Sequence, residues 1–377
     1  YPEVLRENRK YDDEDEITRL LYRDRQTFAI GHGCAAEWKG ERPKSVNSVW
    51  TETAPTFETP STSADLTDEN GKSLRVSMRK LAGLDKNDTG EEELHHLISS
   101  YQNWIEELKD VDNRKTFEGR FLPISDDLVD TAKLLIQRCE NCLERVRNGI
   151  NYLNSNTQKG KWAREAFKLA NHAMLIAQLR SSRDVRNPVW KDGRLQWDKE
   201  IKNPNPAVED ADRGFWRPFQ IAFLLMTLKG VCDPQDMERE VVDLIWFPTG
   251  GGKTEAYLGL TAFTIFYNRL SGKNVTGADV IMRYTLRLLT AQQFQRAGLL
   301  FCAMEHIRNK KEYKEKLGDK RFHLGMWVGG EASPNSRSQA KTALKKLEKD
   351  SNEVNPFVLL KCPWCNAKFG PRDQKDS

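Results

Sequence analysis

The chain has 377 residues, of which 38% are hydrophobic and 30% charged, as is ordinary for a globular protein of two or three domains. No run of about 18 apolar residues occurs, so the sequence predicts no transmembrane helix. Its seven cysteines are odd in number and scattered, which argues against a disulfide scaffold and favours a reducing compartment such as the cytoplasm.

The net charge of +4 does not by itself identify a nucleic-acid-binding protein. Basic residues nevertheless outnumber acidic ones clearly between positions 283 and 320. A local basic patch matters more for phosphate contacts than the charge of the whole chain. The first residues carry neither an initiator Met nor a signal-peptide pattern, so we expect the chain to begin inside a longer reading frame.

Two regions precede the main motifs. Residues 1–90 mix short apolar runs with proline-rich and serine-rich stretches, which predicts a small, mixed, β-rich accessory domain. Residues 91–210 carry apolar side chains at helical spacing and end in a polar stretch with several prolines. This pattern predicts a helical region followed by a linker.

Residues 211–377 alternate between apolar runs and helical patterns. Helices are predicted at 218–230, 253–269, 287–309 and 338–349, and strands at 241–247, 279–284, 323–328 and 356–361. Such alternation predicts an α/β fold in which helices cover both faces of a parallel sheet.

The clearest motif is Phe-Pro-Thr-Gly-Gly-Gly-Lys-Thr at 247–254, between a predicted strand and a predicted helix. This order is typical of a phosphate-binding loop, whose backbone amides surround the phosphates of ATP at the helix N-terminus. Lys253 would contact the β/γ oxygens, and the Thr254 hydroxyl would ligate Mg²⁺. The expected loop residues are Thr249, Gly250, Gly251, Gly252, Lys253 and Thr254.

Phe247 departs from the generic loop, which has a glycine at that position. The rest of the loop resembles that of superfamily 2 helicases. About thirty residues upstream, Arg217-Pro218-Phe219-Gln220 resembles their Q motif, in which a glutamine reads the adenine edge and an aromatic ring lies nearby. The simpler alternative is an ordinary helix start at Pro218.

Downstream, residues 280–293 resemble motif Ia of these helicases, a strand and helix start that contact the nucleic-acid backbone. Helix N-terminal amides, a hydroxyl and an arginine suit phosphate oxygens, although a solvated basic helix face would look similar. A glycine pair at the end of the next predicted strand would allow close approach of DNA, or would simply form a turn. The expected DNA-binding residues are Arg283, Tyr284, Thr285, Arg287, Gln292, Gly329 and Gly330.

A narrower resemblance covers most of the chain. The residue patterns at 246–257 and 282–290 resemble the DrmA family of DISARM anti-phage helicases. The patterns at 29–38 and 355–365 support this resemblance. The resemblance implies a first RecA-like domain at 211–377, binding of ATP and single-stranded DNA, and a DrmB partner. It also implies a second RecA-like domain and an Asp-Glu motif II. No such motif follows Gly330, so we expect this chain to bind nucleotide better than it hydrolyses it.

Two cysteine pairs share the C-x-x-C spacing. Cys362 and Cys365 flank Pro-Trp in a knuckle-like turn, which is a good half-site for Zn²⁺, with a redox pair or a structural turn as alternatives. We expect the missing ligands beyond the end of the chain. Cys139 and Cys142 lie within a predicted helix, so packing is the better interpretation for them.

These observations favour an ATP-dependent DNA helicase or translocase. One alternative is a nucleotide-regulated DNA-binding assembly module without unwinding activity. Another is a regulatory P-loop ATPase that does not bind nucleic acid.

Overall fold

The computed structural model describes residues 13–22, 28–39, 46–53, 66–67, 72–109, 124, 126–181, 184–201, 203–208, 210, 212–245, 251–273, 277–284, 287–329, 333–349 and 358–369. Its main helices are α3 (Glu91–Lys109), α4 (Val129–Asn154), α5 (Gln158–Arg180), α6 (Pro218–Cys232), α7 (Lys253–Leu270), α8 (Arg287–Arg308) and α10 (Arg337–Lys349). Shorter helices are α1 (Asp13–Leu21), α2 (Met78–Leu81), η3 (Asp126–Leu128), η4 (Met237–Glu240) and α9 (Lys311–Leu317).

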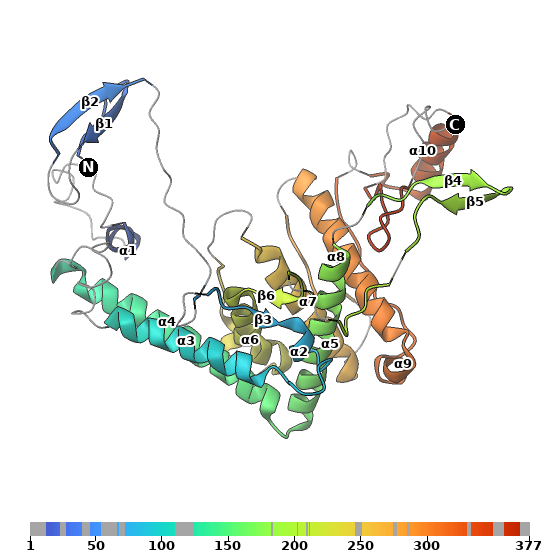
Figure 1. Ribbon diagram of the computed structural model, residues 1–377, viewed down its shortest axis with the longest axis horizontal. Helices are drawn as coiled ribbons and strands as arrows, with labels where there is room; N and C mark the ends of the chain where they lie inside the picture. Colours follow the sequence, from blue (N-terminus) through green and yellow to red (C-terminus); the bar gives the residue numbers. More distant parts are fainter. Residues whose placement is uncertain are drawn as a thin grey trace.

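Helix α5 lies at the centre of the helical core and packs against α2, α4, α7 and α8 (Figure 1). The Thr157 hydroxyl caps its N-terminus by accepting a hydrogen bond from the Gly160 backbone amide at 3.1 Å. Small side chains recur along α5 at positions 163, 166, 170 and 173, and all four are buried. These alanines allow neighbouring helices to approach α5 closely, because they add little volume between the backbones.

Helices α4 and α6 also cross at close range. A Cβ atom at Gly149 of α4 would lie 2.1 Å from the Leu225 carbonyl oxygen of α6. Only glycine therefore fits at this crossing. Helix α3 lies along the other part of α4 (Figure 1), with Leu94, Leu97 and Ile105 buried.

The strands of the described residues form three two-stranded antiparallel sheets. They pair β1 (Ala35–Lys39) with β2 (Ser48–Glu52), β3 (Val76–Ser77) with β6 (Phe215–Trp216), and β4 (Pro188–Lys191) with β5 (Arg194–Trp197). The β4–β5 turn places Asp192 and Gly193 at φ of 53° and 70°, the left-handed geometry that a two-residue hairpin requires.

Trp216 of β6 contacts both α5 and α7. Its indole is 1% exposed, and its Nε1 donates a 2.7 Å hydrogen bond to Asn171 Oδ1 on α5. The Asn171 amide nitrogen in turn donates to the Phe167 carbonyl oxygen at 2.8 Å. On the other side, a Cβ atom at Gly259 of α7 would lie 2.7 Å from the Trp216 ring, so glycine lets α7 reach the indole. The Trp216 side chain thereby sets the separation of α5 and α7.

The structure confirms the long helices predicted from periodicity, including those at 218–230, 253–269, 287–309 and 338–349. Over their described residues, the predicted strands at 241–247, 279–284 and 323–328 are not part of any sheet, so the parallel sheet and the three-domain division stay predictions. Residues 321–329 do alternate between inward and exposed side chains, as a half-buried strand would. Residues 356 and 357 lie outside the described residues.

Two other features of the sequence can be compared with the described residues. In the part of the chain that the structure describes, no helix is both long and apolar enough to cross a membrane. Cys139 and Cys142 lie half-buried on α4, and Cys139 contacts the Tyr101 side chain of α3. Burial raises the pKa of both thiols. This pair therefore packs between helices, as predicted.

Replacing Trp216 with Phe should lower the free energy of unfolding by about 1–3 kcal/mol, because the buried Asn171 oxygen would lose its donor. Urea unfolding followed by circular dichroism measures the change. The matched control is Trp190→Phe at an indole that is 70% exposed, which should change stability by no more than about 0.5 kcal/mol. Equal effects of the two variants would contradict the structural role of Trp216.

Candidate phosphate-binding site

The described end of the predicted phosphate loop is the start of α7. Gly252 precedes the helix with φ 86° and ψ 20°, and Lys253 and Thr254 begin the first turn, both half-buried. The first backbone amides of a helix have no intrahelical acceptor, so they can donate to an anion. The predicted residues Gly251, Gly252, Lys253 and Thr254 therefore lie together at a helix N-terminus. Thr249 and Gly250 lie outside the described residues.

Two side chains at the start of α6 hold the backbone of this loop. Arg217 Nη1 donates to the Gly251 carbonyl oxygen at 2.8 Å, and Gln220 Nε2 donates to the Gly252 carbonyl oxygen at 2.8 Å. Because both carbonyls are bound on the side of α6, the peptide units that follow Gly251 and Gly252 are held in fixed orientations. We call this arrangement of Arg217 and Gln220 the loop clamp.

The clamp is itself fixed by the start of α6. The Arg217 backbone amide donates to Gln220 Oε1 at 2.9 Å, and the Gln220 amide donates to the Arg217 carbonyl oxygen at 3.0 Å. Pro218 stands at the first position of the helix, where its fixed φ and missing amide are favourable. This reciprocal capping leaves the Gln220 side chain 4% exposed and in one orientation.

Gln220 therefore has a role that its sequence motif did not predict. Its amide oxygen and nitrogen each bind the protein backbone, one at the helix cap and one at the loop. Reading of an adenine edge by Gln220 stays a prediction. Phe219, the predicted aromatic neighbour, lies with its ring centroid 5.7 Å from the Arg217 guanidinium carbon.

At Gly252, glycine is required for two separate reasons. Its left-handed φ is unfavourable for other residues. In addition, a Cβ atom there would lie 2.7 Å from Gln220 Nε2 and would displace the clamp. The backbone conformation and the contact with Gln220 thus both require glycine at position 252.

Two ion pairs position the elements around the loop. Glu255 in the first turn of α7 pairs with Arg296 of α8, and its other oxygen, Oε2, is buried without a hydrogen-bond partner among the described residues. Arg145 of α4 donates to both carboxylate oxygens of Asp243, at 2.5 and 2.9 Å. Asp243 first, and then Glu238, raise the pKa of Arg145 despite its burial. Because Asp243 lies in the segment that leads to the loop, this bidentate pair anchors that segment to α4.

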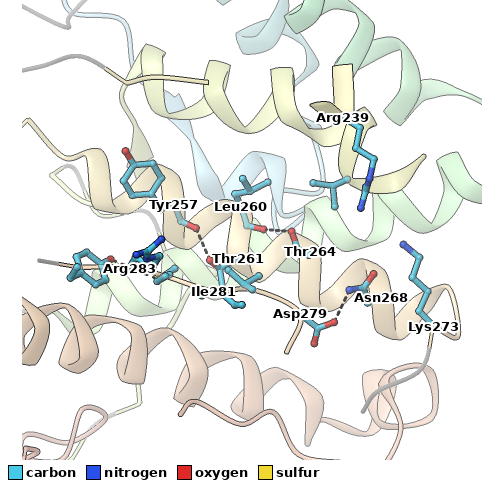
Figure 2. A pocket seen from close by; sticks show the side chains of 14 residues that line it. Arg239, Tyr257, Leu260, Thr261, Thr264, Asn268, Lys273, Asp279, Ile281 and Arg283 are labelled. Carbon is cyan, nitrogen blue, oxygen red and sulfur yellow. Dashed lines mark hydrogen bonds between the residues drawn. The ribbon is translucent and has the colours of Figure 1, made fainter. Parts of the chain in front are cut away.

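The predicted DNA-contacting segment lies beside α7. Residues 279–284 and one face of α7 line a cavity of about 600 Å³, with Val231, Arg239 and Lys273 completing the lining (Figure 2). Figure 2 shows Asn268 of α7 bonded to Asp279, a contact of 2.6 Å that holds the segment along the helix. The 279–284 segment therefore lies along α7, the helix that begins at the predicted phosphate loop.

The remaining predicted DNA-contacting residues are only partly placed. Arg283 and Tyr284 are exposed and line the cavity, and Gln292 is exposed on α8. Arg287 begins α8, but its side chain lies outside the described residues, as do Thr285 and Gly330. Gly329 is exposed at the end of the alternating segment, with no atom within 4 Å of a Cβ built on it.

Sequence reasoning missed three positioning residues, Arg217, Arg145 and Arg296. Arg217 is the first residue of the recognised motif, and its backbone forms a capping pair with Gln220 three residues later, which was a usable signal. The partners of Arg145 and Arg296 lie 98 and 41 residues away in the chain. Sequence spacing carries no information about such pairs.

Replacing Gln220 with Glu should lower the free energy of unfolding by about 1–3 kcal/mol, because a carboxylate cannot donate to the Gly252 carbonyl oxygen. Chemical denaturation measures this loss. The matched control is Gln178→Glu. The Gln178 side-chain oxygen accepts a hydrogen bond from the Gly214 amide at 2.9 Å, and a glutamate oxygen can accept the same bond. If both variants unfold at the same denaturant concentration, the clamp contributes nothing.

No protein-family model matches the chain. The chain is 33% identical over 385 residues to the DISARM protein DrmA of Bacillus paralicheniformis. This alignment covers 97% of the chain and 31% of that relative, so the chain spans about a third of the relative's length. Over nearly its whole length the chain is therefore DrmA-like, which confirms the resemblance that its motifs indicated.

Proposed function

We propose that this chain is the nucleotide-binding and DNA-contacting part of an ATP-dependent superfamily 2 helicase or translocase in a DISARM anti-phage system. The observation that carries the proposal is the loop clamp, in which Arg217 and Gln220 bind the carbonyls of Gly251 and Gly252. A clamp on the carbonyl side of a glycine loop leaves its amides for an anion. Similarity to DrmA supports the defence setting.

In this proposal each loop residue has one task toward ATP and Mg²⁺. Gly251 and Gly252 present backbone amides to the phosphates, and the N-terminus of α7 adds its partial positive charge. Lys253 supplies a full charge to the β/γ oxygens, and Thr254 contributes its hydroxyl to Mg²⁺. When Mg²⁺ is bound, it neutralises charge that develops on the phosphates.

Coupling to DNA would pass along α7. Its N-terminus holds the nucleotide, and its middle and end contact the 279–284 segment through the shared cavity and the Asn268–Asp279 bond. Arg283 and Tyr284 are exposed on that segment and would contact the backbone or bases of single-stranded DNA. A shift of α7 on nucleotide binding would then move the DNA-contacting residues.

Hydrolysis would need groups that the proposed loop does not include. No Asp-Glu pair follows Gly330 in these 377 residues. We expect this chain to bind nucleotide better than it hydrolyses it. By the resemblance to DrmA, directional movement on DNA would also require a second RecA-like domain and a DrmB-like partner.

The second candidate is a nucleotide-regulated DNA-binding module that assembles with partners and does not unwind DNA. The connection between α7 and the 279–284 segment supports this function equally, because it requires coupling without directional steps. A strand-displacement assay on the longer protein separates the two functions. Unwinding supports the helicase, and ATP-dependent DNA binding without unwinding supports the assembly module.

Lys253→Ala should weaken nucleotide binding by tenfold to hundredfold, as is expected on losing a charge-assisted contact of about 1.5–3 kcal/mol. Titration of a fluorescent ATP analogue against the purified chain measures the affinity. Lys161→Ala on exposed α5 surface is the matched control and should bind like the unmodified chain. Unchanged affinity in a folded Lys253→Ala variant would refute the nucleotide site.

Arg283→Ala should weaken single-stranded DNA binding and should reduce the slope of log affinity against log salt by about 0.7, because one phosphate contact is lost. Fluorescence anisotropy at several salt concentrations gives both quantities. Arg194→Ala, at an exposed position in the β4–β5 hairpin, is the control. An identical salt slope for Arg283→Ala and the unmodified chain would exclude a contact there.

A further inference from the structure

The last part of the described chain contains two features that the phosphate site does not use, the cysteine turn and helix α10. Cys362 and Cys365 are half-buried thiols in the turn. Among the described residues, no three His, Cys, Asp or Glu side chains are placed to hold one metal ion, so the predicted zinc half-site is not completed there. Helix α10 offers the stronger feature, a face of one charge.

The start of α10 is fixed by a capping box. The Gln339 backbone amide donates to Ser336 Oγ at 3.2 Å, and the Ser336 amide donates to Gln339 Oε1 at 3.1 Å. The helix then continues for 13 residues, a length of about 20 Å. Its side chains therefore project in a defined register.

One face of α10 is turned toward the rest of the protein. Leu347 is buried, and Ala343 and Ala340, which lie one and two turns before it, are half-buried. At the helical spacing of 3.6 residues per turn, the five basic side chains project from the other half of the helix. All five are exposed, namely Arg337, Lys341, Lys345, Lys346 and Lys349.

Three of these side chains form a straight row along the exposed face. Lys341, Lys345 and Lys349 follow one another at intervals of four residues, which is about 6 Å along the axis. Like charges at this spacing destabilise a helix. Among the described residues, no carboxylate lies within ion-pair distance of any of the five cations. We call Lys341, Lys345 and Lys349 the lysine row; its uncompensated charge is complementary to a polyanion.

A neighbouring helix shows how an ordinary solvated face differs from this one. In α9, three lysines are interleaved with two glutamates, and Lys316 pairs with Glu165 of α5 at 3.0 Å. Mixed signs of this kind are typical of a helix face that contacts only water. In α10, Glu348 is the only acidic residue. The charge pattern of α10 therefore favours an anionic partner over solvent alone.

A lipid surface fits α10 poorly as that partner. Helices that lie in a membrane interface bury large apolar side chains among the lipids. The side chain of Leu347 is already buried within the protein, and Leu344, at 46% exposed, is the one large apolar side chain that α10 leaves accessible. The helix thus lacks the apolar area that membrane insertion requires.

A nucleic-acid duplex fits the lysine row better than a single strand does. Sites for single strands combine cations with aromatic side chains on which the bases stack, and α10 contains no aromatic residue. A straight row on a rigid helix suits the regularly spaced phosphates of a duplex. Lysine is a hydrated point charge without the fork of arginine, so it suits phosphate contacts more than base reading.

We propose that α10 is a sequence-independent binding surface for duplex DNA, in which the lysine row contacts phosphates of the backbone. Arg337 and Lys346 flank the row and would reach adjacent phosphates. Figure 1 shows α10 at the margin of the molecule, outside the helical core around α5. The choice of DNA over RNA rests on the proposed function, whereas the duplex contact rests on α10 alone.

The test measures binding of the full chain to blunt DNA duplexes of two unrelated sequences, by fluorescence anisotropy at several salt concentrations and without nucleotide. A triple variant with Lys341→Gln, Lys345→Gln and Lys349→Gln should reduce the slope of log affinity against log salt by about 2.7, since each lost phosphate contact removes about 0.9. The reduction should be the same for both sequences, because phosphates carry no sequence information. Arginine at the same three positions keeps the charges and should preserve the slope.

The matched control replaces three exposed lysines of other helices, Lys133, Lys161 and Lys168, with glutamine, so the net charge falls equally. This control should keep the duplex salt slope of the unmodified chain, and circular dichroism should show equal helix content in all variants. Equal slopes for the α10 variant and the control would overturn the proposal. An equal loss of slope on single-stranded DNA would overturn the preference for duplex.

Two competitors test the other anionic partners. Unlabelled duplex should displace the labelled duplex, whereas poly-glutamate and phosphatidylserine vesicles should displace it much less. If poly-glutamate or the vesicles compete as well as duplex does, the row serves an acidic protein or a lipid surface, and the proposal is wrong. Failure of the Lys253 and Arg283 predictions would remove the proposed function but would leave the duplex slope of α10 unaffected, so the two outcomes are distinguishable.

Discussion

The buried hydrogen bond between Trp216 and Asn171 is the constraint on which the site depends. It fixes the indole between α5 and α7, and Gly259 lets α7 rest on that indole. Arg217 is the next residue along the chain, so the position of the indole also sets where the loop clamp begins. Because the bond is fully desolvated, breaking it leaves a buried polar atom unpaired, and the arrangement is strongly specified.

Helix α7, which rests on the Trp216 indole, has a different part of the site at each end. At its N-terminus, Arg217 and Gln220 bind the carbonyls of the glycine loop. Toward its C-terminus, the helix holds the 279–284 segment and the cavity between them. A rigid helix between two sites can couple them, because a small movement at one end displaces the other. Arg296 ties the same helix to α8.

Helices were predictable here because their signal is local. Apolar positions three and four residues apart marked α3, α4 and α5, and Pro218 marked the start of α6. Strands could not be predicted from local spacing in the same way. Residues 321–329 have the right alternation of exposure, yet strand pairing depends on partners that are distant in sequence. For the same reason, a glutamine recognised by its motif proved to bind a loop 32 residues away.

The sequence by itself predicted a phosphate loop at 247–254, because glycine conformation, the lysine charge and the helix that follows act within a few residues of one another. It also determined the resemblance to DrmA. Only the tertiary structure decided that Arg217 clamps Gly251 and that α8 packs Gly298 and His306 against the 362–365 turn. Those contacts join residues 34 or more positions apart, and it is the packing of α5, α7 and α8 that brings them within reach.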